Sequence, residues 1–192
     1  MSRIQVIQPK DAEGRLKEIH TEIVQKRGQL GEVHKIQSLR PESILKHIDF
    51  YMEIMFSKSE LSRAHREMMA AVVSMVNQGT YCATHHGSAL NHYWKNSEKI
   101  ELLKTDFHSL DLSEKELGLC EFARLLALQP ESNKKTDLTR DLKEFGLSDA
   151  AILDATLVVS YFNFVNRMVF TLGVEIETDE GENYKYKPDE RK

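Results

Sequence analysis

The stretch VNQGTYCATHHGSAL, residues 76–90, holds side chains that could carry out thiol chemistry. Gly79 favours a break between two helices, so that a new helix would begin at Thr80 and place Cys82 in its first turn. Unbonded backbone N–H groups and the helix dipole favour a thiolate there and lower the pKa of the thiol. His86 follows four residues later, on the same face, where an imidazole can take the thiol proton and return it.

A carboxylate precedes this stretch on what should be a separate helix. Glu67 is the only acidic residue between Arg63 and Gln78, and an apolar run follows it directly. If that helix is buried, the carboxylate needs a polar partner. Because Glu67 lies twelve residues before the helix break, the two helices could pack with the carboxylate facing the new one. The sequence therefore predicts a proton relay of Glu67, His86 and Cys82.

Each of these residues also has a simpler interpretation. A lone cysteine such as Cys82 is commonly a small buried apolar residue. Glu67 could pair with Arg63 at i,i+4 on the surface, where such a pair adds little stability. His85 and His86 point about 100° apart on a helix, so only one of them can face a site. A zinc or iron site of Cys82, His86 and Glu67 lacks supporting spacing such as CxxC or HExxH, so no metal or cofactor is predicted.

The bulk properties restrict the class of protein. The 192 residues carry a net charge of -4, with acids and bases interspersed, which gives no basic stripe for nucleic acid. Cys82 and Cys120 are too few for a disulfide framework and fit a reducing cytoplasm, and Cys120 has the surroundings of a core residue. The longest apolar run, residues 150–174, is interrupted by an aspartate, two asparagines and an arginine, and the N-terminal segment has no apolar signal core. We therefore expect no membrane segment and a cytoplasmic location.

The pattern along the chain predicts an all-α protein. Period-2 alternation is almost absent, and apolar residues recur at helical spacing. We expect seven or eight helices in one domain, residues 1–177, followed by a polar tail, residues 178–192. We expect helices to end at Gly28 or Gly31, at Gly79, before Pro130 and at Gly146, and Pro41 to occupy a first helical turn. The expected N-caps are Ser59, Thr80, Ser113, which forms a capping box with Glu116, and Ser148.

The last long apolar helix carries polar residues that need an explanation. Asn163 and Arg167 fall on one face at i,i+4. Asn166 and Arg167 on an otherwise apolar helix suggest a buried polar network or an oligomer contact.

Together, these motifs resemble the alkylhydroperoxidase D (AhpD)-like superfamily, which includes the carboxymuconolactone decarboxylase family. Its redox members carry a glutamate, then CxxC, then a histidine four residues past the second cysteine. The segment NQGTYCATHH is similar to the NxCxYCxxHH form of the peroxidase-related branch. The later segments LSEKELGLCEFARLLALQP and GLSDAAILDATLVVSYFNFVNRMVFTLGVE look like the usual ending of that branch. The resemblance covers roughly residues 15 to 177.

The resemblance implies an AhpD-like helical bundle that assembles into homo-oligomers, dimers or larger. It also implies peroxide reduction by a thiol, with electrons from an external thiol or dithiol and no cofactor. Cys82 matches the cysteine that attacks the peroxide, and His86 and Glu67 match the residues that assist it. Tyr81 and His85 flank this site and could donate hydrogen bonds.

One position departs from the family pattern. Gly79 stands where the resolving cysteine belongs, and a glycine cannot form the intramolecular disulfide. An external thiol could instead reduce Cys82 in a one-cysteine mechanism. Cys120 could resolve it only if the two Cα atoms approach within about 7 Å. Alternatively, peroxidase activity is lost, leaving a non-redox protein that binds a small molecule or acts as a scaffold, or a carboxymuconolactone decarboxylase-like enzyme.

Overall fold

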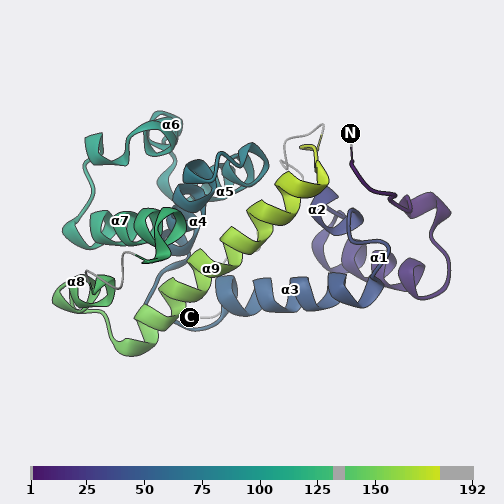
Figure 1. Cartoon of the computed structure of the whole chain (residues 1–192), viewed down its shortest axis with the longest axis horizontal. Coiled ribbons are helices and arrows are strands. Elements are labelled where there is room, and N and C mark those ends of the chain that lie inside the picture. Colours follow the sequence, from purple (N-terminus) through teal and green to yellow (C-terminus); the bar gives the residue numbers. More distant parts are fainter. Residues whose placement is uncertain (1, 132–136, 178–192) are drawn as a thin grey trace.

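The computed structural model describes residues 2–131 and 137–177, and within these ranges every regular element is helical (Figure 1). The all-α prediction is confirmed. The predicted tail, residues 178–192, lies outside the described residues. The α-helices are α1 (Gly14–Arg27), α2 (Glu32–Lys35), α3 (Pro41–Phe56), α4 (Arg63–Val76), α5 (Thr80–Trp94), α6 (Ser97–Thr105), α7 (Glu114–Leu128), α8 (Leu138–Glu144) and α9 (Asp149–Leu172).

Side-chain caps define several of the helix starts. At α7 the Ser113 hydroxyl accepts from the Glu116 backbone N–H, and the Glu116 carboxylate accepts from the Ser113 N–H, as the capping box predicts. At α9 the Ser148 hydroxyl accepts from the Ala151 N–H, and Pro41 occupies the first turn of α3. These boundaries therefore follow from local sequence.

Two predicted caps are wrong. The N-cap of α4 is Ser62, whose hydroxyl accepts from the His65 N–H, and not Ser59. The Ser59 hydroxyl instead donates to the Asp154 carboxylate of α9, a long-range contact that helical periodicity cannot reveal. Gly79 itself is the N-cap of α5, and Thr80 is the first helical residue.

Helix α4 lies at the centre of the main core. It packs against α5, α7 and α9, and α9 crosses the molecule diagonally between the α4–α8 group and α1–α3 (Figure 1). The whole segment of α4 from Arg66 to Ser74 is buried. Cys120 of α7 is fully buried in the same core, as expected, and burial raises the pKa of its thiol.

The N-terminal segment contacts the other end of the chain. The Arg3 guanidinium donates to the Phe170 and Thr171 carbonyl oxygens at 2.7 and 3.1 Å, and the Arg3 N–H donates to the Leu172 carbonyl oxygen. These are carbonyl groups of the last turn of α9, which have no partner further along the helix. A cation there also complements the helix dipole.

Three buried histidines, His20, His34 and His47, lie where α1, α2 and α3 meet. The rings of His34 and His47 are in edge contact with centroids 5.5 Å apart. The amide nitrogen of Gln37 lies 2.8 Å from His47 Nδ1 and can only donate. His47 Nδ1 therefore accepts this hydrogen bond, and the ring is neutral. Burial, with a smaller contribution from the charge of Arg27, lowers the pKa of His47 to about 4.

Acidification should therefore destabilise the fold. Unfolded histidine takes up a proton near pH 6.5 and folded His47 only near pH 4, so the stabilising effect of neutral His47 is complete above pH 6.5 and lost as pH falls to 4. We expect the loss from this residue to reach about 3 kcal/mol. Urea unfolding at pH 7.5 and pH 4.5 should show a smaller difference for His47→Gln than for the parent. The exposed His92→Gln should behave like the parent, and an equal loss in all three proteins would contradict the assignment.

No helix of the described residues is long and apolar enough to cross a membrane.

Candidate thiol site

The predicted contact between Glu67 and His86 is present. Glu67 Oε2 of α4 lies 2.6 Å from His86 Nδ1 of α5, and the Glu67 side chain is almost fully buried. The ring of His86 also packs edge-on against Phe162 of α9, with centroids 4.3 Å apart. Helices α4 and α9 therefore hold the imidazole of His86, which α5 carries, from two sides.

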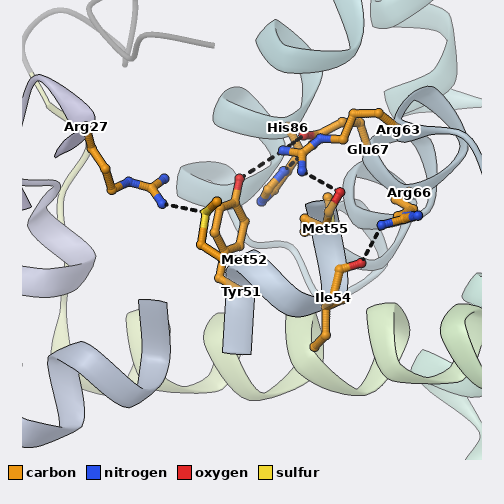
Figure 2. Close-up of polar contacts among 9 residues, drawn as sticks. All are labelled: Arg27, Tyr51, Met52, Ile54, Met55, Arg63, Arg66, Glu67 and His86. Atoms are coloured by element: carbon orange, nitrogen blue, oxygen red, sulfur yellow. Dashed lines mark hydrogen bonds and ion pairs between the residues drawn. The ribbon is translucent and has the colours of Figure 1, made fainter. Parts of the chain in front are cut away.

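Arg63 is the second partner of the carboxylate. Its guanidinium contacts Glu67 Oε1 at 2.5 Å, so the two carboxylate oxygens serve different residues (Figure 2). Arg63 also donates to the Met55 carbonyl oxygen at 2.7 Å and to the Tyr51 hydroxyl at 3.1 Å. The sequence left open whether Glu67 pairs with Arg63 or faces the histidine, and the structure contains both contacts, in a buried setting.

The charges of this group are mutually supporting. Burial alone would raise the pKa of Glu67, but the positive charge of Arg63 and the contact with His86 outweigh it and lower the pKa below its usual range. An ionised carboxylate can only accept, so His86 Nδ1 carries a proton. In a neutral imidazole the lone pair then lies on Nε2, which leaves that nitrogen as the base.

Cys82 lies one turn before His86 on α5, in the first turn of the helix as predicted. It is 2% exposed. Among the residues that the structure describes, no hydrogen bond joins Cys82 to His86. Among the described residues, the structure thus brings together two members of the predicted relay, and it places the third, Cys82, one turn before His86 on α5 without a hydrogen bond to it.

The expected lowering of the thiol pKa is not found. Burial, and secondly the negative charge of Glu177, raise the pKa of Cys82 to about 12. The favourable helix N-terminus is outweighed because a thiolate loses its hydration when it is buried. Cys82 is therefore a neutral thiol in this conformation, and its activation requires a base at the moment of reaction.

The site-flanking residues Tyr81 and His85 both contact Glu177, which follows α9. The Tyr81 hydroxyl donates to Glu177 Oε1, and His85 Nε2 donates to Oε2, each at 2.8 Å. The Glu32 backbone N–H donates to Oε1 as well. Burial alone would raise the pKa of Glu177, but these hydrogen bonds, that of His85 first, lower it to about 2. The carboxylate therefore stays ionised near Cys82.

Removal of the Glu177 charge should increase the reactivity of Cys82. We expect Glu177→Gln to lower the pKa of the thiol and to speed its alkylation at pH 8 by about tenfold, since a charge several ångströms away in partly buried surroundings is worth on the order of 1 kcal/mol. Alkylation kinetics with a maleimide measure this directly. Glu175→Gln removes an exposed charge from the same segment and should leave the rate unchanged. Equal rates for the parent and Glu177→Gln would contradict the electrostatic role.

Gly79 lies in close contact with α9. A Cβ atom at this position would lie 1.8 Å from Asn166 Oδ1. The Asn166 amide nitrogen donates to the Ser74 hydroxyl at 3.2 Å and to the Phe162 carbonyl oxygen at 2.8 Å. The polar network predicted for the last helix is therefore present at Asn166. Arg167 is exposed and donates to Asn163 on the same helix.

Three residues of this region escaped the sequence analysis as site residues, namely Arg63, Asn166 and Glu177. Arg63 could be recognised from the sequence only as an alternative i,i+4 partner of Glu67 on the surface. Asn166 was expected in either a buried polar network or an oligomer contact, with no link to Gly79. Glu177 lies where the chain looked like the start of a polar tail, so no local pattern marked it. Among the described residues, no cluster of three or more histidine, cysteine or acidic side chains has the arrangement of a metal site.

Comparisons with known proteins address the fold. No family model matches the chain, and no curated protein matches it. Among solved structures, the chain is similar to an alkylhydroperoxidase AhpD core, an uncharacterized peroxidase-related protein from Ralstonia eutropha JMP134. The TM-score is 0.82 at 21% identity, with 93% of this chain and 94% of that chain covered.

Two further structures agree. A peroxidase-related protein from Silicibacter sp. TM1040 gives a TM-score of 0.80 at 21% identity, covering 95% of this chain and 98% of that chain. The debrominase Bmp8, in complex with 2,3,4-tribromopyrrole, gives 0.75 at 18% identity, covering 95% and 97%. The likeness extends over nearly the whole of both chains in each case, and the chain therefore has the AhpD-like helical fold.

Proposed function

We propose that the chain is a one-cysteine thiol oxidoreductase of the AhpD-like superfamily that reduces peroxides with Cys82. The observation that carries the proposal is the buried series Arg63–Glu67–His86 (Figure 2). The series ends one helical turn from Cys82, the only cysteine of α5. A buried ion pair that orients an imidazole beside a thiol is an arrangement that serves proton transfer. A solely structural role would not require the histidine at its end.

The proposed reaction starts with proton transfer from the Cys82 thiol to His86. The thiolate attacks the peroxide oxygen, so that an S–O bond forms and the O–O bond breaks. The leaving alkoxide takes the proton from His86, giving an alcohol and the Cys82 sulfenic acid. One external thiol then displaces water to form a mixed disulfide, and a second thiol releases Cys82 as the thiol. Gly79 supplies no resolving sulfur, so both electrons come from outside the chain, in a reducing compartment such as the cytoplasm.

Residue-specific mass spectrometry tests the proposal. After mild peroxide treatment and dimedone trapping, we expect a sulfenic acid adduct on the peptide that contains Cys82. His86→Ala should form it at least about a hundredfold more slowly, the usual contribution of a general base. Cys120→Ser should form it like the parent, because Cys120 is fully buried on another helix. A parent protein that yields no adduct, or a His86→Ala variant that oxidises as readily, would end the proposal.

A second candidate is a non-redox protein that binds a small molecule on the same fold. The burial of Cys82 favours this candidate, because burial raises the pKa of the thiol and disfavours a resting thiolate. Maleimide alkylation and dimedone trapping separate the two candidates: a Cys82 thiol that resists both maleimide and peroxide supports the binding protein. Because the debrominase Bmp8 has the same fold, 2,3,4-tribromopyrrole is a suitable compound for a direct binding measurement by isothermal titration calorimetry.

We propose further that a second copy of the chain covers an aromatic patch formed by Phe50 and Phe164. These side chains are 47% and 53% exposed, and both contact the ring of Tyr161. Exposed aromatic groups from two helices are typical of protein interfaces. Light scattering should give the parent a mass at least twice the 22.1 kDa of one chain and Phe164→Glu a mass of one chain. A monomeric parent would exclude the assembly.

A further inference from the structure

The side chain of Asn166 occupies the space that a side chain at position 79 would need. A Cβ on Gly79 would lie 1.8 Å from Asn166 Oδ1 and 3.0 Å from Asn166 Cγ. Gly79 is the N-cap of α5 and Cys82 is the third residue of its first turn, and the side chains of these two positions commonly lie close together, as they do in a capping box. The amide oxygen therefore occupies the place of a side chain at position 79, where the first cysteine of a CxxC pair would stand three residues before Cys82.

The orientation of this amide is fixed by its partners. The Phe162 carbonyl oxygen can only accept, so the group 2.8 Å from it must be the amide nitrogen. The Ser74 hydroxyl donates to the Ala70 carbonyl oxygen and so accepts from the same nitrogen. The oxygen is thereby turned toward Gly79 and away from α9.

Asn166 Oδ1 is a buried acceptor without a donor among the described residues. The residue is only 3% exposed. A buried carbonyl oxygen that lacks a hydrogen bond is unfavourable, and such atoms often mark a place where a ligand or reacting group supplies the donor. The Cys82 thiol is a poor donor, whereas an S–O–H group on the same sulfur is a good one and reaches further.

We infer that Asn166 is a positioning residue for the oxidised form of Cys82, and that its Oδ1 accepts the O–H of the Cys82 sulfenic acid. This inference rests on the proposed function, because it requires the sulfenic acid to form. An acceptor for the O–H favours the neutral acid over the sulfenate anion. The anion is the form that attacks a second peroxide, by which sulfur gains an oxygen and a second alcohol leaves. Asn166 thus protects the sulfenic acid until an external thiol arrives.

The experiment follows the sulfenic and sulfinic forms of Cys82 with time. The parent, Asn166→Leu and Asn166→Ala are treated with hydrogen peroxide, trapped with dimedone at intervals, and analysed at the Cys82 peptide. In both variants we expect the sulfenic acid to form at the parental rate and to convert to sulfinic acid roughly fivefold faster, the effect of one neutral hydrogen bond. Asn163→Ala, one turn earlier on α9, should behave like the parent.

The outcomes separate this inference from the proposed function. If the sulfenic acid forms in the parent and lasts as long in both Asn166 variants, Asn166 does not protect the sulfenic acid, while the thiol chemistry of Cys82 stands. Slower formation with an unchanged lifetime would assign Asn166 to peroxide binding and also overturn the inference. If the parent forms no adduct, both proposals fall together. Thermal unfolding by circular dichroism verifies that each variant is folded, and the alanine variant covers the case in which leucine does not fit.

Discussion

Glu67→Gln is expected to destabilise the protein by about 3 kcal/mol, because it leaves the buried Arg63 without a counter-ion. The Arg63 and Glu67 side chains are only 7% and 1% exposed, so water cannot replace the lost charge. The same change removes the anion that holds His86 Nδ1–H, and we expect oxidation of Cys82 to slow by about a hundredfold. Urea unfolding measures the first effect and trapping of the sulfenic acid the second.

Two controls separate stability from chemistry. Glu22→Gln breaks an i,i+4 pair with Lys26 whose side chains are 44% and 71% exposed, and it should change the unfolding free energy by less than about 0.5 kcal/mol. The double variant Arg63→Met with Glu67→Met replaces the buried pair by apolar groups and should recover much of the stability without recovering the oxidation rate. A Glu67→Gln variant that unfolds like Glu22→Gln would show that the buried pair is not structurally important.

Gly79→Ala is expected to be destabilising only while Asn166 is present. The new methyl group would overlap Asn166 Oδ1 and force the amide out of its hydrogen bonds with Ser74 and Phe162. Overpacking of this kind costs about 1–3 kcal/mol, and the displaced hydrogen bonds add to it. In an Asn166→Ala background the amide group is gone, and the next atom beside a Cβ at position 79 is the Ser74 carbonyl oxygen, 3.4 Å away. Gly79→Ala should then cost little stability.

A double-mutant cycle on Gly79→Ala and Asn166→Ala measures this coupling, which we expect to be about 2 kcal/mol. Additive effects would mean that Asn166 moves aside freely. The cycle also explains how a resolving cysteine should be restored. Gly79→Cys alone meets the same overlap, whereas Gly79→Cys with Asn166→Ala has room for the sulfur. Only the latter should form a disulfide with Cys82 after peroxide treatment.

The sequence was sufficient for those parts of the fold that depend on nearby residues. The capping box of Ser113 and Glu116 involves groups three residues apart, so its geometry follows from the helix itself. Ser59 was misassigned because its partner, Asp154, is 95 residues away. A serine that precedes a helix has the same local signature whether it caps the helix or contacts a distant side chain.

The candidate site likewise has features that the sequence could predict and features that depend on contacts between distant elements. Glu67 and His86 could be paired from their spacing and from the need of a buried carboxylate for a partner. The raised pKa of Cys82 could not be anticipated, because it depends on how deeply α5 is covered by other elements. The link between Gly79 and Asn166 joins residues 87 positions apart, and a glycine gives no sign of what fills the space beside it.

The contacts of Arg3 with the last turn of α9 connect the segment before α1 with the part of the chain that leads to the site. Glu177, which holds Tyr81 and His85, follows that turn by only a few residues. Release of the Arg3 guanidinium would loosen the turn from which Glu177 extends and so reach the neighbourhood of Cys82. Loss of the Arg3 contacts is thus a perturbation of the thiol environment, which the maleimide alkylation rate of an Arg3→Ala variant would reveal.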